Sequence, residues 1–347
     1  MLTLQSVYSD LLENVSYRDS LTHFPPGGAF FCKKYRGTNY WYYRLYQNGE
    51  AIKRYLGKET PEVLHLMQQH GKASRVNKNC RTLIKALQGG GCVFPLGPMG
   101  AVAKALADAG FFRLRGVLVG TLAFQCYPAM LGVDIARRGS IAGIKFVTGD
   151  IDLAQFRSIS LAVEDQMTES FAKAIGQAGQ FEPVLPFSMA DSRPTRWHDA
   201  ATGCFVDLLV PLVGKDEEVM YLPSMQAYGA ALRFLDFLIY DERPAVIPYR
   251  GGIAVNVPSP ERYAVHKLII SQNRRDKIKQ KKDIAQASFL LEAMLHSEKA
   301  VIRETVQEAA DRGKGWRTRL GAGIRELPSP LAKEILGFLT PAVATAP

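Results

Sequence analysis

Three aspartates lie in segments whose other residues are typical of buried β-strands. Asp150 and Asp152 flank one isoleucine in TGDIDLA, and Asp207 interrupts the apolar run CFVDLLVP. Because side chains alternate between the two faces of a strand, we expect Asp150 and Asp152 to project from the same face. Two such carboxylates repel each other unless a cation lies between them, and a carboxylate within an apolar strand is costly without a partner. The three aspartates are therefore a candidate metal site.

Magnesium is the cation that such a set favours, with Mn²⁺ as the alternative, because Mg²⁺ takes a few carboxylates together with phosphate oxygens and water. If Asp207 lies on the strand beside the pair, three carboxylates can hold two metal ions. One ion then lowers the pKa of an attacking hydroxyl, and the other holds a triphosphate and the leaving pyrophosphate. We therefore expect Asp150, Asp152 and Asp207 to be both catalytic and metal-binding, with an NTP as substrate.

A glycine-threonine corner precedes the aspartates. Residues 115–119 predict a short strand that ends at Gly120 and Thr121, and residues 122–131 predict a helix. A glycine between a strand and a helix lets backbone N–H groups approach phosphate oxygens, and the threonine hydroxyl adds a donor. Such a corner is usually only a turn, and an acid-x-acid pair is usually a solvated turn or cap. Their order and strand context favour a functional interpretation of both.

The net charge of +10 is concentrated in two blocks on either side of the aspartates. Residues 1–90 hold 13 Lys and Arg against 6 Asp and Glu, and residues 262–282 hold 8 against one. A basic surplus of this kind favours a polyanionic partner such as a nucleic acid or a triphosphate. The alternative is a basic protein without such a partner.

Aromatic and basic residues are mixed in the first block. Turn motifs rich in Gly and Asn separate three β-rich segments, near residues 29–35, 40–47 and 51–56. A small sheet of this composition can stack bases and hold phosphates, so residues 29–56 are a candidate nucleic-acid surface. Because half of the aromatic side chains must face inward, the alternative is a sheet whose aromatics form a core against a neighbouring helix.

The second block begins on a predicted helix, PERYAVHKLI, in which Lys267 lies among apolar residues. We expect Lys267 to contact the triphosphate from a helix packed against the core. The alternative is a lysine whose stem lies along apolar surface while its ammonium reaches water. The rest of residues 262–282 is a second candidate contact with NTP or nucleic acid, or else a solvated loop.

The series LVGTLAF, TGDIDLA and FVDLLVP resembles the nucleotidyltransferase superfamily of DNA polymerase β. In that superfamily a Gly-Ser or Gly-Gly corner opens a helix, an acid-x-acid pair follows, and a third acid lies on a later strand. With PERYAVHKLI and KKDIAQASFLL, the motifs are most similar to a bacterial group of nucleotidyltransferase-fold proteins of poorly defined function, distantly related to AbiEii-type toxins. The resemblance covers residues 95–295. It implies metal-binding roles for Asp150, Asp152 and Asp207 and phosphate contacts for Gly120 and Thr121.

The predicted fold class is α/β (α+β), a nucleotidyltransferase-fold mixed sheet with helices. We expect three units: an N-terminal helix with an antiparallel hairpin sheet and a second helix (1–90), the catalytic core (95–215), and a mostly helical C-terminal part (216–347). Helical patterns also cover residues 98–109 and 163–178, and a strand is expected near residues 143–147.

Several classes of protein are disfavoured by composition. Interrupted apolar runs exclude the roughly 18–20 apolar residues of a membrane span, and we expect no signal peptide and a cytoplasmic location. Five scattered cysteines fit reduced thiols rather than a disulfide framework. The six histidines lack zinc-ligand spacing.

The function that we expect is Mg²⁺-dependent transfer of NMP from an NTP to an unidentified hydroxyl acceptor on RNA, protein or a small molecule. Two alternatives stay open. One is a protein on the same fold that binds nucleic acid through its basic hairpins without catalysis. The other is a toxin-type nucleotidyltransferase that acts on tRNA.

Overall fold

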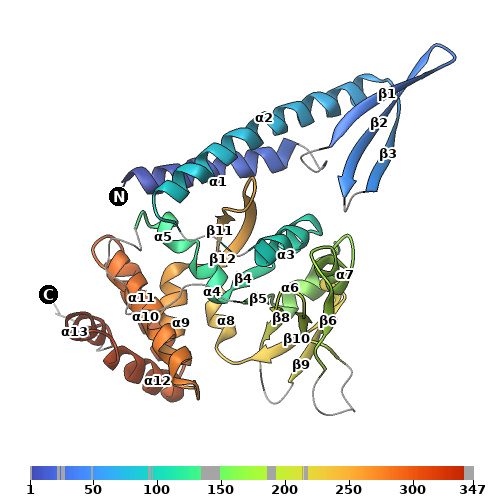
Figure 1. Ribbon diagram of the computed structural model, residues 1–347. Coiled ribbons are helices and arrows are strands. Elements are labelled where there is room, and N and C mark those ends of the chain that lie inside the picture. Colours follow the sequence, from blue (N-terminus) through green and yellow to red (C-terminus); the bar gives the residue numbers. More distant parts are fainter. Residues whose placement is uncertain are drawn as a thin grey trace.

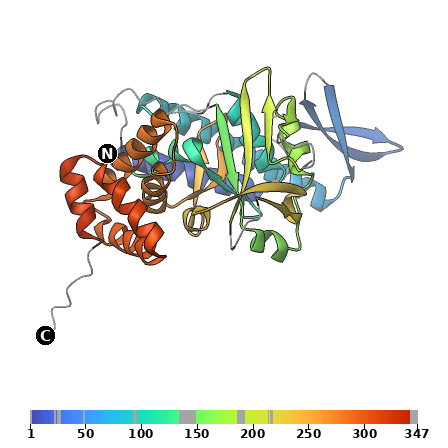
Figure 2. The ribbon, with the colours of Figure 1, turned by 90° about the horizontal axis from the view of Figure 1, so that it is seen from below.

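The computed structural model describes residues 2–21, 24, 28–47, 50–92, 95, 97–133, 149–185, 193–212, 214 and 218–339. A small sheet and a group of helices lie at opposite ends of the molecule, with a larger mixed sheet between them (Figure 1 and Figure 2). This mixed α/β architecture confirms the predicted fold class. Within the described residues, no helix combines the length and apolar character needed to cross a membrane.

The N-terminal part is a helical hairpin that carries the small sheet. Helices α1 (Leu2–Leu21) and α2 (Pro61–Gly89) pack side by side (Figure 1). The predicted antiparallel sheet is confirmed, with the order β1 (Ala29–Tyr35), β2 (Thr38–Gln47) and β3 (Glu50–Lys58). Thr60 caps α2 by accepting a hydrogen bond from the Val63 N–H, and Pro61 opens the helix.

The central sheet is mixed, and its middle strand pair is parallel. Strand β5 (Asp150–Ala154) lies between β4 (Val117–Val119), which runs antiparallel to it, and β8 (Cys204–Pro211), which runs parallel. The remaining strands extend the sheet beyond β8: β6 (Phe181–Pro183), β7 (Arg196–Asp199), β9 (Val219–Leu222) and β10 (Ala227–Leu232). Strands β7 and β8 form an antiparallel hairpin.

Short helices connect these strands: α3 (Gly97–Asp108), α4 (Gly120–Phe124), α5 (Tyr127–Met130), α6 (Arg157–Ala162), α7 (Phe171–Gly176), α8 (Leu235–Leu238) and the 3₁₀ turn η1 (Pro223–Met225). The single helix predicted over residues 163–178 is wrong, because only α7 forms there. Before α7 the backbone makes long-range bonds instead, from Met167 N–H to Ser224 and from Thr168 N–H to Ala109. The helix predicted over residues 122–131 is likewise divided, with a turn before α5. The strand predicted near 143–147 lies outside the described residues.

After the last strand of the central sheet, the chain forms an antiparallel pair, β11 (Glu242–Ile247) and β12 (Ile253–Pro258). Five helices follow: α9 (Pro260–Ser271), α10 (Lys277–Met294), α11 (Lys299–Asp311), α12 (Lys314–Arg325) and α13 (Ser329–Gly337). Helix α9 is buried along most of its length because α10, α11 and α12 all pack on it. A Cβ at Gly323 would meet the Leu268 carbonyl oxygen at 2.3 Å, so α12 approaches α9 more closely than a larger residue allows.

Buried polar contacts attach the helical hairpin to the rest of the chain. The Arg18 guanidinium donates to the carbonyls of Gly251 and Gly252 at 2.6 and 3.0 Å, and to Asn77 Oδ1 at 3.2 Å. The Tyr8 hydroxyl accepts from the Val246 N–H at 2.8 Å. These bonds fix α1 and α2 against β11 and against the turn between β11 and β12.

Replacing Arg18 with methionine should lower the free energy of unfolding by about 2–4 kcal/mol, because two buried carbonyls lose a charged donor. Urea denaturation followed by circular dichroism measures this change. Arg75→Met, which alters an exposed residue on α2, is the matched control and should change stability little. Equal midpoints for the two variants would show that Arg18 does not hold the hairpin in place.

Candidate functional site

The candidate site is a row of residues that crosses four strands of the central sheet. Asp152 on β5 lies directly opposite Asp207 on β8, and on its other side it pairs with Val119 at the end of β4. Asp207 in turn pairs with Arg196 on β7. As predicted, Asp207 is therefore on the strand beside the acidic pair, and Asp152 is its direct neighbour.

Alternation along β5 and β8 separates the acidic face from the apolar core. Ile151 and Leu153 are fully buried, as are Val206 and Leu208, whereas the aspartates between them are only partly buried. Asp150 lies two residues before Asp152 and so shares its face. The sheet thus presents three carboxylates on one side while its other side is core.

The glycine-threonine corner lies against Asp152. Gly120 has φ of +66°, and a Cβ at this position would stand 2.0 Å from Asp152 Oδ2 and 3.0 Å from its Cγ. Any larger residue would therefore displace the carboxylate as well as strain the backbone. Thr121 is 8% exposed and is the second residue of α4, which begins at Gly120. The structure brings the predicted corner and the acidic pair together.

Arg196 supplies the positive charge nearest to two of the carboxylates. Its Nε lies 3.5 Å from Asp207 Oδ1, and its Nη2 lies 3.8 Å from Asp150 Oδ1. The guanidinium carbon stands 4.2 Å from the centroid of the Phe205 ring, on which His198 also stacks. Sequence reasoning missed Arg196. The feature that could have revealed Arg196 is its position in the β7–β8 hairpin, because the register of that hairpin places Arg196 opposite Asp207.

The nearby positive charges compensate the three carboxylates only in part. Burial raises the pKa of Asp152; the Lys267 ammonium opposes that shift, and the Asp150 carboxylate adds to it. Burial, followed by the charge of Asp152, raises the pKa of Asp207 to about 6, although Arg196 acts against the shift. With the side chains in these positions, no trio of His, Cys, Asp or Glu in the described part of the chain is close enough together to hold a metal ion. Arg196 lies between two of the candidate ligands instead.

Helices α9 and α10 place further cations beside the aspartates. Lys267 Nζ donates to Asp283 Oδ1 at 2.6 Å, and Arg274 Nε donates to Asp283 Oδ2 at 2.7 Å. Burial acts to raise the pKa of Asp283, but the two cations outweigh it and hold the pKa below its ordinary value. Lys267 is therefore a buried, paired lysine, and its charge still acts on Asp152.

Tyr263 connects α9 to the corner. Its hydroxyl lies 2.8 Å from the Gly120 carbonyl oxygen and 3.1 Å from Gln286 Oε1 on α10. The Lys267 ammonium lies 5.2 Å from the centroid of the Tyr263 ring. Tyr263 thus connects α9 and α10 to the Gly120 corner and also contacts Lys267. The two helices therefore help to position the residues of the candidate site.

Residues 262–282, the second basic block, divide into paired and rim positions. Arg262 donates to both carboxylate oxygens of Glu308, so it is a structural contact between α9 and α11. Lys279 and Lys282 lie three residues apart on α10 and interact electrostatically with the aspartates. The charge of Lys279 acts to lower the pKa of Asp207. Burial, followed by the charge of Lys267, lowers the pKa of Lys282, while Asp150 and Asp152 act against that shift. The block thus contributes cations to one edge of the acidic face.

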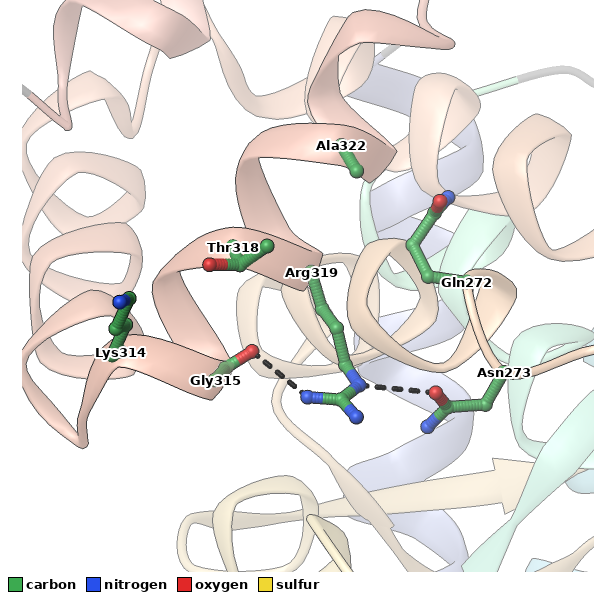
Figure 3. A pocket seen from close by; sticks show the side chains of 7 residues that line it. All are labelled: Gln272, Asn273, Lys314, Gly315, Thr318, Arg319 and Ala322. Atoms are coloured by element: carbon green, nitrogen blue, oxygen red, sulfur yellow. Dashed lines mark hydrogen bonds between the residues drawn. The ribbon is translucent and has the colours of Figure 1, made fainter.

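A separate cavity of about 600 Å³ lies between the end of α9 and the start of α12 (Figure 3). Arg319 spans it by donating to Asn273 Oδ1 and to the Gly315 carbonyl, at 3.0 and 3.1 Å. None of the three aspartates lines this cavity. It is therefore distinct from the acidic site.

Comparison with known proteins identifies the central part of the chain. Residues 98–311 match a family described as nucleotidyltransferase, and residues 3–65 match a family described as a domain of unknown function. No curated protein and no solved structure is significantly similar to the chain. The nucleotidyltransferase match spans more than half of the chain and includes the corner, the three aspartates, and α9 and α10. The chain belongs to this nucleotidyltransferase family.

Proposed function

We propose that the chain transfers NMP from an NTP to a hydroxyl acceptor, with Asp150, Asp152 and Asp207 as ligands of Mg²⁺ or Mn²⁺. The observation that carries this proposal is the cross-strand pairing of Asp152 with Asp207. It gathers negative charge that burial and mutual repulsion leave undercompensated, and a divalent cation relieves both. The metal supplies charge neutralisation at the phosphates and a lowered pKa at the attacking hydroxyl.

The protein's own groups have distinct roles in this reaction. The acceptor oxygen forms a bond to the α-phosphorus, the bond from that phosphorus to the pyrophosphate oxygen breaks, and the acceptor proton passes to Asp207. In the metal-free protein, burial followed by the charge of Asp152 raises the pKa of Asp207 to about 6, so Asp207 is ionised at neutral pH and can accept a proton. Lys267, fixed by Asp283, and the rim lysines of α10 attract the triphosphate.

Arg196 is the residue that must adjust when a metal binds. Its guanidinium now compensates Asp150 and Asp207 from 3.8 and 3.5 Å. If these carboxylates held a divalent ion, Arg196 would no longer be needed to compensate them and could contact phosphate oxygens. Arg196 is 41% exposed and can move without disturbing the core.

Asp152→Asn should reduce label transfer from α-labelled NTPs by about 10²-fold or more, because the central ligand loses its charge. The assay uses Mg²⁺ or Mn²⁺ with total RNA, total protein and small-molecule hydroxyls as acceptors. Asp241→Asn, which changes an aspartate paired with Arg243 at the surface, is the matched control and should keep the wild-type rate. Transfer by Asp152→Asn at the wild-type rate would exclude the proposed site. Absence of transfer by the wild type would favour nucleic-acid binding without catalysis.

In the metal-free protein, stability should fall as the pH rises from about 4 to about 7. The folded pKa of Asp207 is about 6, above its ordinary value of 3.8, so the protonated form favours folding and that contribution is lost as Asp207 ionises. The size of the effect is on the order of 3 kcal/mol. Urea unfolding in EDTA at several pH values measures it. Asp207→Asn should remove most of this dependence, and an unchanged pH profile in that variant would contradict the assignment.

Arg196→Met should increase the stabilisation that Mg²⁺ provides. The variant lacks the cation that offsets the repulsion between the carboxylates in EDTA. A divalent ion should therefore stabilise the folded variant more than it stabilises the wild type. Thermal unfolding with and without Mg²⁺ gives the melting-temperature difference for each protein. Arg243→Met, at an exposed surface pair, should behave as wild type. A smaller Mg²⁺ effect in Arg196→Met would show that the arginine does not take the metal's place.

A further inference from the structure

The two faces of the small N-terminal sheet differ, because one of them contacts α2 through Phe30 and Tyr43. On the inner face, Phe30 and Tyr43 contact each other with ring centroids 5.0 Å apart, and both contact His70 of α2 at 5.1 and 5.5 Å. Tyr43 is 4% exposed. This inner face is the aromatic core that sequence reasoning weighed as the alternative for the whole sheet.

The outer face follows from the strand register, because directly paired residues share a face. Phe31 pairs with Tyr42, and Tyr42 pairs with Tyr55 across the other edge of β2. By the same register the outer face holds six aromatic and four basic side chains: Phe31, Tyr35, Tyr40, Tyr42, Tyr46, Tyr55, Lys33, Arg44, Lys53 and Lys58. No acidic residue occupies a described position on this face, whereas Glu59 accepts from Trp41 on the inner one.

The outer aromatics form a continuous ladder with cations between the rungs. Phe31 stacks on Tyr42 at 5.3 Å, and Tyr42 contacts Tyr55 at 5.2 Å. The Arg44 guanidinium lies over both Phe31 and Tyr46, at 5.6 and 5.5 Å. Tyr46 and Tyr55 are 64% and 56% exposed. Rings that are ordered by their neighbours yet open to solvent are suited to stacking against a ligand.

The sheet projects clear of the central sheet, and the positive charge continues along its support. In both views it extends beyond the body of the molecule at the end of α2 (Figure 1 and Figure 2). Helix α2 carries exposed basic residues toward the body, including Arg75, Lys78, Arg81 and Lys85. Arg81 and Lys85 line a groove of about 380 Å³ together with Arg250. Residues 28–92 hold twelve Lys and Arg against three Glu.

We propose that the outer face of this sheet binds single-stranded nucleic acid, which α2 then leads toward the body as the acceptor of the transferred nucleotide. The role as acceptor rests on the proposed nucleotidyl transfer, but the binding does not. Single strands offer both the phosphates that match the lysines and the open base faces that match the rings. In a duplex the base faces are covered. A lipid surface would favour exposed aliphatic side chains, but the described, paired positions of the outer face include no Val, Leu, Ile or Met.

The binding test uses the full chain carrying Asp150→Asn and Asp152→Asn in EDTA, so that catalysis plays no part. Fluorescence anisotropy measures the affinity for a labelled RNA of about 20 nucleotides, for DNA of the same sequence and for the matching duplex, at several salt concentrations. The charge variant is Lys33→Gln/Lys53→Gln/Lys58→Gln. Its matched control is Lys173→Gln/Arg233→Gln/Lys333→Gln, which removes the same charge from exposed positions elsewhere.

The charge variant should bind the single strand at least tenfold more weakly and reduce the salt slope by about 2, because three phosphate contacts are lost. The control variant should keep the parent affinity and slope. Tyr35→Ala/Tyr46→Ala should weaken binding about tenfold without changing the slope, because stacking releases no counterions. Both tyrosines are more than half exposed, and circular dichroism of each variant verifies that the sheet is folded.

Three results would overturn the inference: equal losses in the charge variant and its control, duplex bound as tightly as single strand, or binding to anionic phosphatidylglycerol vesicles that depends on this face while RNA binding does not. The two proposals fail separately. Face-dependent RNA binding by a wild type that transfers no label leaves this inference intact and removes the enzymatic one. Label transfer by a protein whose RNA binding does not depend on the outer face supports the proposed nucleotidyl transfer and removes this inference.

Discussion

The parallel pairing of β5 with β8 is the constraint on which the candidate site depends. It sets Asp152 opposite Asp207, and alternation along both strands commits Ile151 and Val206 to the core on the other side. The carboxylates cannot move apart without breaking that core, so burial, followed by the charge of neighbouring carboxylates, raises the pKa values of both. A cation is the physical remedy, and the protein's own cation, Arg196, comes from the next strand of the same sheet.

The remaining cations come from outside the sheet. Burying Lys267 is costly, and its 2.6 Å contact with Asp283 offsets that cost. Arg274 forms an ion pair with the second oxygen of Asp283, so Asp283 neutralises the Lys267 charge only in part. The remaining charge of Lys267 acts to lower the pKa of Asp152. Tyr263 ties the same helix to the corner at Gly120. The C-terminal helices therefore determine the electrostatics of a site whose carboxylates lie elsewhere in the chain.

The N-terminal part stands apart from the candidate site. Its sheet is held by α2 at a distance from the central sheet, while Tyr8 fixes the helical hairpin to β11 and Arg18 fixes it to the turn between β11 and β12. A family profile of its own matches residues 3–65, apart from the nucleotidyltransferase match. The hairpin thus connects the small sheet, whose inner face makes aromatic contacts with α2, to the larger core built on the mixed sheet.

Local rules sufficed for much of this protein. Turn residues and alternation predicted the three hairpin strands, and the spacing of Asp150 and Asp152 placed them on one face. These features depend on neighbours in sequence. The tertiary structure alone decided that Arg196 faces Asp207, that Asp283 holds Lys267, and that residues 163–170 leave the predicted helix to bond Ser224 and Ala109. Such partners are chosen by strand order and by the burial of the whole core, which bring together charges and backbone groups that no local pattern relates.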